Sequence, residues 1–218
     1  MAVRQPKKKS GLVEQGMAYG KDPNLEEAIF AVREVDHISR DIPIICKTRG
    51  MACAVEVGGK QRLLTWQGVI NEHDQAKPIR LHRYLKNVFT AQKNCWFEMS
   101  QIKQTDICSF ISVKRGDART PNIDFGILKL KVLGSVEKSK EVSAHSFIGC
   151  KDIVKFTFKY DRGKHELKCS GKKYCIFEKS SILGSPIIID KCHVIGVVGE
   201  DRNGRLCPYF LTETEVGK

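Results

Sequence analysis

Short apolar runs, rich in Val, Ile and Phe, alternate along this chain with turn-forming residues. Runs of about four to eight such residues are typical of β-strands, whereas helices need longer stretches with a 3.6-residue period. Clusters of Gly, Asp, Asn and Lys at 57–61, 161–164, 169–173 and 201–205 separate the runs. About thirteen strands at this spacing predict an all-β protein made of barrels or sandwiches, not an alternation of strands and helices.

The same pattern predicts how the chain is organised. Residues 1–24 are polar and basic, which predicts a flexible lead-in. Residues 24–40 start with Asn and acidic residues and place apolar residues at roughly helical spacing, which predicts one short N-terminal helix. Residues 134–146 are poor in apolar residues and form the best internal boundary. The predicted organisation is a flexible basic segment at 1–24 and a domain at 25–218, with one set of strands at about 42–134 and another at about 146–212.

The composition restricts the setting in which the protein works. It has 37 Lys and Arg against 25 Asp and Glu, for a net charge of +12. Such a charge attracts nucleic acid, acidic proteins or anionic lipid, although a basic surface is also an ordinary property of soluble proteins. No run of roughly eighteen apolar residues exists, so no membrane span is predicted. Because no secretory signal is recognisable, we expect a cytoplasmic protein. The run "PKKK" at 6–9 is the one feature that suggests nuclear import as an alternative.

The nine cysteines have no regular spacing. An odd number without a secretory signal predicts reduced thiols. Zinc is the alternative, since Cys169 and Cys175 are followed by Cys192, His193 and Cys207, but the CxxC and HxxxH pairs of structural zinc sites are absent. We therefore predict no metal and no cofactor.

Three segments, taken in order, resemble the sequence blocks of the trypsin-like (PA-clan) serine proteases. "MACAVEVGGKQRLLTWQGVI" (51–70) resembles the unit that ends in the family's "LTAAHV" block, which carries the histidine. "NIDFGILKLK" (122–131) resembles the aspartate block "DIALLKL", and "SSILGSPIIIDKCHVIGVVG" (180–199) resembles the serine block "GDSGGP". The resemblance extends over roughly residues 42–212. It implies two six-stranded antiparallel β-barrels of the chymotrypsin type.

The resemblance also implies which residues occupy the catalytic positions. In the family a serine hydroxyl attacks, a histidine takes its proton, and a buried aspartate orients the histidine. The aspartate position falls on Asp124, whereas the histidine position falls on Gly68 and the serine position on Leu183. Glycine supplies no base and leucine no nucleophile. We therefore predict a pseudoprotease that is not an enzyme.

Two other routes to chemistry stay open at this level. In a register shifted by two residues, Ser181 or Ser185 would be the nucleophile, but the histidine would still be missing. Cys175 and Cys192 flank the loop on predicted strands. Cys192 and His193 are expected to point to opposite faces of a strand and so not to pair. An active serine or cysteine hydrolase with a rearranged site is the least favoured alternative.

The preferred function is an intracellular module that binds a protein or peptide. A cleft without catalytic groups would hold a peptide without cutting it, and an edge strand would add a peptide strand through backbone hydrogen bonds. The candidate lining residues of the cleft are Trp66, Gln67, Leu183 and Ser185.

The second hypothesis is nucleic-acid binding through residues 153–170 and the basic stretch that follows. Clean alternation around a central turn predicts a hairpin there. Basic residues beside Tyr160 and Tyr174 suit single strands, because phosphates meet positive charge and bases stack on aromatic rings. The basic candidates are Arg162, Lys164, Lys168, Lys172 and Lys173.

Overall fold

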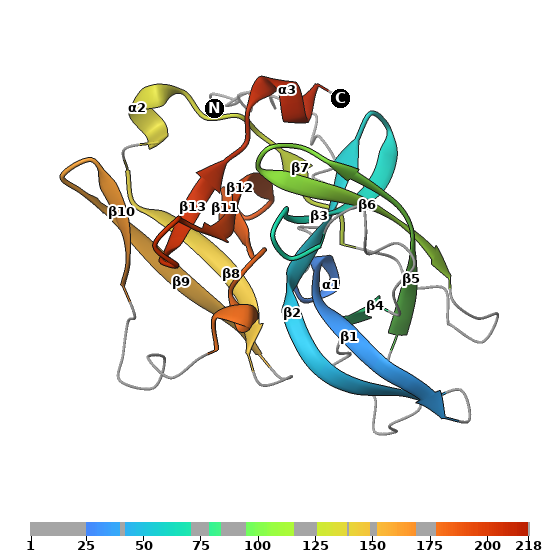
Figure 1. The fold of residues 1–218 in the computed structure, drawn as a ribbon. Helices are drawn as coiled ribbons and strands as arrows, with labels where there is room; N and C mark the ends of the chain where they lie inside the picture. Colours follow the sequence, from blue (N-terminus) through green and yellow to red (C-terminus); the bar gives the residue numbers. More distant parts are fainter. Residues whose placement is uncertain are drawn as a thin grey trace, which may run out of the picture.

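The structure is a computed structural model that describes residues 25–39, 42–70, 79–83, 95–115, 126–138, 140–148, 152–168 and 178–217. The described chain is mostly β and forms two sheets that lie side by side (Figure 1). None of its described helices is long and apolar enough to cross a membrane.

The first sheet is a ring of six antiparallel strands. In chain order these are β1 (Ile29–Ser39), β2 (Ile42–Val57), β3 (Lys60–Trp66), β4 (Ile79–Arg83), β5 (Cys95–Gln104) and β6 (Cys108–Arg115). They pair in the order β1-β2-β3-β6-β5-β4, and β4 pairs back to β1, so this sheet is a closed barrel. The β2–β3 connection is the dipeptide Gly58-Gly59, whose φ angles of 56° and 71° suit the tight turn of a hairpin.

The second sheet has seven strands. They are β7 (Lys129–Leu130), β8 (Val142–Ile148), β9 (Asp152–Asp161), β10 (Lys164–Lys168), β11 (Pro186–Ile189), β12 (His193–Glu200) and β13 (Leu206–Phe210). Six of them pair in the order β10-β9-β8-β11-β12-β13, and β7 pairs in parallel with β12. The two edge strands approach each other, since the rings of His165 on β10 and Phe210 on β13 are 5.4 Å apart.

The predicted pair of closed barrels is therefore confirmed only in part. The first sheet closes, whereas no pairing between β10 and β13 closes the second among the described residues. The first sheet also includes β1, which precedes residue 42, where we expected this barrel to begin. The hairpin expected at 153–170 is present as β9 and β10.

The predicted helix over 24–40 is wrong for most of its length. Only one helical turn, α1 (Leu25–Ala28), is present, and β1 follows it directly. Ile29 and its three successors are all buried, because Ile29 and Ala31 belong to one apolar cluster while Phe30 and Val32 belong to another. A strand that is buried on both faces has no alternation of apolar and polar residues, so its sequence is not distinguishable from a buried helix. The other short helices are α2 (Ser135–Lys138), the 3-10 turn η3 (Lys179–Ser181) and α3 (Glu213–Val216).

An apolar cluster holds the two sheets together. It contains Met51, Cys53 and Val55 of β2 together with Val194 and Val197 of β12. The segment before β7 also lies at this junction, since Leu128 pairs with Val55 while the residues after it pair with β12. Alternate residues of β2 thus face the second sheet, which places the histidine and serine blocks at one junction.

Candidate functional site at the junction of the two sheets

The loop of the serine block contains the 3-10 turn η3. The backbone N–H of Ser181 donates a hydrogen bond to the Glu178 carbonyl at 2.9 Å, and the N–H of Leu183 donates to the Lys179 carbonyl at 2.9 Å. In the serine-protease template, the oxyanion hole consists of the N–H of the nucleophile position and the N–H two residues earlier. By the resemblance these are Leu183 and Ser181. Both donors are therefore engaged inside the loop.

Gly184 determines how closely this loop approaches the first barrel. Its φ of 78° lies in the left-handed region, which glycine adopts without steric cost. A Cβ at this position would overlap with the Met51 carbonyl and the Thr65 hydroxyl. The Met51 N–H donates to the Leu183 carbonyl at 2.7 Å, and the Thr65 hydroxyl donates to the Met51 carbonyl at 2.6 Å. The loop is thus held against β2 and β3.

Two of the three positions that the sequence resemblance assigns to the triad, Gly68 and Leu183, come to this junction. The half-buried side chain of Leu183 packs on the apolar cluster that includes Val69, the residue after Gly68. A Cβ on Gly50 would lie 2.5 Å and 2.7 Å from the two Val69 methyl groups and 2.8 Å from the Leu183 carbonyl oxygen. The third position, Asp124, lies outside the described residues.

The side chain of Trp66 fills the space above Gly68. The chain turns after β3, where the Val69 N–H donates to the Trp66 carbonyl at 3.0 Å, and a Cβ on Gly68 would overlap with the indole ring. On the other side, a Cβ on Gly199 of β12 would lie 2.6 Å from the indole Nε1. The indole also stacks on Tyr209 of β13, with ring centroids 6.4 Å apart and an angle of 23°. Trp66 thus extends from Gly68 to the second sheet.

Sequence reasoning did not identify this role of Trp66. The sequence indicates Trp66 only as a candidate lining residue of the cleft. The half-buried side chain packs against two of the apolar clusters, so it connects the barrel and the second sheet. The available signal was a large aromatic residue two positions before a glycine, but nothing local pointed to Gly199 as the other contact.

The remaining cleft candidates differ in exposure. Ser185 is fully buried, and its hydroxyl oxygen has no hydrogen-bond partner among the described residues. In this conformation the hydroxyl contacts neither solvent nor an imidazole, which does not favour Ser185 as a nucleophile. Gln67 is half-buried, and its N–H donates to the Ile107 carbonyl at 3.1 Å.

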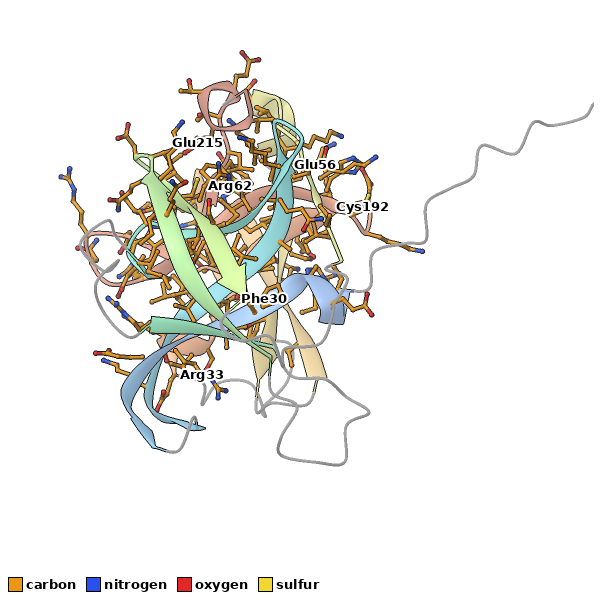
Figure 2. All side chains as sticks on the ribbon, turned by 90° about the vertical axis from the view of Figure 1, so that its right-hand side faces the viewer. Phe30, Arg33, Glu56, Arg62, Cys192 and Glu215 are labelled. Atoms are coloured by element: carbon orange, nitrogen blue, oxygen red, sulfur yellow. The ribbon has the colours of Figure 1, made fainter. Side chains whose placement is uncertain are left out.

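The expectation for Cys192 and His193 is wrong. The Cys192 Sγ lies 3.5 Å from the His193 Nδ1. Cys192 is in the turn between β11 and β12, not in a strand, and Asp190 and Lys191 have φ angles of 49° and 62°. Figure 2 labels Cys192 at this turn. The rule that neighbouring side chains point to opposite faces applies to extended strands and not to such a turn.

The alternative nucleic-acid site is described only in part. Arg162 and Lys164 lie at the turn of the β9–β10 hairpin and are exposed, whereas the Lys168 side chain, Lys172 and Lys173 lie outside the described residues. Lys159 pairs with Glu166 across the strands, and Asp161 pairs with Lys164, so acidic residues interrupt the basic face. Tyr160 is 42% exposed, and its ring lies edge-on to that of His165, with ring centroids 4.9 Å apart. Because Tyr160 follows Lys159 directly in β9, the two side chains point to opposite faces of the strand. Nucleic-acid binding stays a prediction.

No group of three potential metal ligands occurs among the described residues, which include Cys192, His193 and Cys207. Cys169 and Cys175 lie outside the described residues.

The comparison with solved structures shows what the chain is similar to. Deg5 has 11% sequence identity and a TM-score of 0.51 over 84% of each chain. GrC has 12% identity and a TM-score of 0.51 over 86% of this chain and 91% of its own. The MamO protease domain from Magnetospirillum magneticum has 9% identity and a TM-score of 0.50 over 87% of this chain and 94% of its own.

At these identities the comparison shows the fold alone. The chain has a mostly β fold similar to that of the trypsin-like (PA-clan) serine proteases, as the three sequence blocks predicted. Neither a family model nor a curated protein matches this sequence.

Proposed function

We propose that this chain is a catalytically inactive domain with a trypsin-like protease fold that binds a protein or peptide without cutting it. The observation that carries the proposal is the position of Trp66. Its indole fills the space that a side chain at Gly68, the histidine position, would need. A general base must reach the nucleophile within hydrogen-bond distance, and here an indole occupies that room.

Two further features support the inactive half of the proposal. Leu183 supplies an apolar side chain at the serine position, and that side chain packs on the barrel. The N–H groups of Ser181 and Leu183 are hydrogen-bonded within the loop, so stabilising an oxyanion would require the loop to rearrange first. Restoring one catalytic side chain would therefore leave the rest of the machinery unformed.

Covalent probes test this half directly. The folded protein is treated with a fluorophosphonate and, separately, with a peptide-like cysteine probe, and the intact mass is measured. We expect no fold-dependent adduct on the natural sequence or on Gly68→His/Leu183→Ser, because the indole still blocks residue 68. A urea-unfolded sample is the control for non-specific labelling. A single stoichiometric adduct at Ser181, Ser185 or a cysteine of the folded natural sequence would refute the inactive half.

The binding half needs its own test. A displayed peptide library is selected on the folded protein, and the selected peptides are incubated with it and weighed. We expect ligands that lose affinity when the protein is unfolded and that keep their mass. Cleavage of such a peptide would contradict the absence of catalysis. Failure to select any fold-dependent ligand, in a library that yields ligands for a control domain, would contradict peptide binding.

A further inference from the structure

A cavity of about 190 Å³ lies on the face of the first barrel that α3 covers. Its walls are the β2–β3 hairpin, the β5–β6 hairpin and the single turn of α3. The junction described above is lined by other residues. The lining residues are Val57, Gly58, Lys60, Arg62, Lys103, Thr105, Phe110 and Glu215.

Three cations line this cavity. Lys60 and Lys103 are exposed at its rim, and Arg62 is half-buried in its wall. Arg62 donates a hydrogen bond from Nη1 to the Ser112 hydroxyl on the neighbouring strand β6, which orients the guanidinium. Within the described part of the chain, none of the three cations forms an ion pair. Their charges are therefore available to a ligand.

The one carboxylate in the wall, Glu215, already has its partners. It is 3% exposed, and its Oε1 accepts a hydrogen bond from the Thr105 hydroxyl at 2.8 Å and lies 3.7 Å from the Cys108 thiol. Its Oε2 accepts from the Thr212 N–H at 2.8 Å and from the Thr212 hydroxyl at 3.2 Å. Oε1 thus links α3 to the β5–β6 hairpin, and Oε2 caps the start of α3 itself (Figure 2 labels Glu215 and Arg62). Three cations against one carboxylate leave the cavity with a positive potential.

The size and the apolar part of the wall restrict the ligand further. A volume of about 190 Å³ is smaller than that of the sites that hold drug-sized ligands. Phe110 and Val57 give the cavity an apolar wall against which a short alkyl stem can pack. An arginine fork binds a carboxylate through two parallel hydrogen bonds.

We propose that this cavity binds a carboxylate on a short alkyl stem, namely an acidic side chain of a peptide. Arg62 binds the carboxylate, Lys60 and Lys103 add charge at the rim, and Phe110 and Val57 contact the stem. The inference stands on the cavity alone, so it holds or fails independently of whether the chain cuts peptides.

The test is an NMR titration of the nitrogen-15-labelled protein with acetyl-glutamate methylamide, which carries one carboxylate and no other charge. We expect shifts of the Gly58 and Thr105 amide signals and a dissociation constant of about 1 mM, as for a ligand of this size. The matched ligand, acetyl-glutamine methylamide, differs only in the missing charge and is expected to bind at least about tenfold more weakly. Inorganic phosphate is titrated as a second anion.

Variants locate the binding. Arg62→Gln is expected to weaken binding about tenfold, and Lys103→Gln serves if Arg62→Gln alters the amide spectrum of the free protein. Lys159→Gln removes the same charge from the exposed face of β9 and is expected to leave the constant unchanged within about twofold. The proposal is overturned if the two amides bind equally, if Lys159→Gln weakens binding as much as Arg62→Gln, or if phosphate binds and the glutamate amide does not.

Discussion

The contact between Trp66 and Gly68 gives a prediction whose size follows from the structure. Gly68→Ala adds a Cβ that overlaps with the indole ring. Inserting a methyl group into a packed contact costs about 1–3 kcal/mol of folding free energy. The φ of Gly68 is not positive, so the backbone adds no penalty, and losing glycine entropy in the unfolded state returns about 0.4–1 kcal/mol. We expect a net destabilisation of about 1–2 kcal/mol.

The same substitution in a Trp66→Ala background behaves differently. Without the indole the overlap is gone, and Gly68→Ala becomes neutral or stabilises by up to about 1 kcal/mol. The double-mutant cycle should therefore give a coupling energy of about 2 kcal/mol between residues 66 and 68. Trp66→Ala alone should cost about 3 kcal/mol, the low end for a large side chain, because the indole is only half-buried.

Urea unfolding followed by far-ultraviolet circular dichroism measures the four free energies without relying on tryptophan fluorescence. The natural sequence, the two single variants and the double variant are compared at one pH and ionic strength. An equal cost of Gly68→Ala in both backgrounds would mean that the indole does not fill the space beside Gly68. The main support for an inactive site would then be lost.

Three further outcomes are expected. Gly184→Ala should destabilise the fold by about 3–5 kcal/mol in urea unfolding, because it combines a left-handed φ with an overlap with backbone atoms. Gly58→Ala is the control: its φ is also left-handed, but its Cβ would meet nothing within 4 Å, so it should cost only about 1–2 kcal/mol. Equal costs would refute the overlap at Gly184. Burial, and secondarily the charge of Lys155, lowers the pKa of His145 from 6.5 to about 4. As the pH falls, the unfolded chain therefore binds this proton before the folded chain does, and the free energy of unfolding should fall by up to about 2 kcal/mol between pH 6.5 and pH 4. A His145→Asn variant with an unchanged pH dependence of unfolding would contradict this. Burial raises the pKa of the Cys108 thiol to about 12 and raises the pKa of the Cys53 thiol further. Iodoacetamide at pH 8 should therefore modify both thiols only after the protein unfolds, as measured by peptide mass. Rapid labelling of the folded protein would contradict this, because it would show that these thiols are accessible.

Local sequence was sufficient for some elements and misleading for others. The hairpin at 153–170 was predictable because one face of β9 is buried, at Phe156 and Phe158, while Lys155 and Lys159 are exposed. The start of strand β1 was not predictable, because residues 29–32 are buried on both faces and the alternation is absent there. The pairing of Cys192 with His193 depends on turn dihedrals that the two residue names do not reveal.

The sequence alone shows that residue 68 has no base and residue 183 has no hydroxyl, at the two positions that the family resemblance assigns to the histidine and the serine. It also determined the order of the three blocks, and with it the resemblance that predicted the fold. What fills the space beside Gly68 depends on the tertiary structure. The indole of Trp66 is placed by Gly199 and Tyr209 of the second sheet, far along the chain, and contacts between such distant residues depend on how the two sheets pack rather than on local sequence.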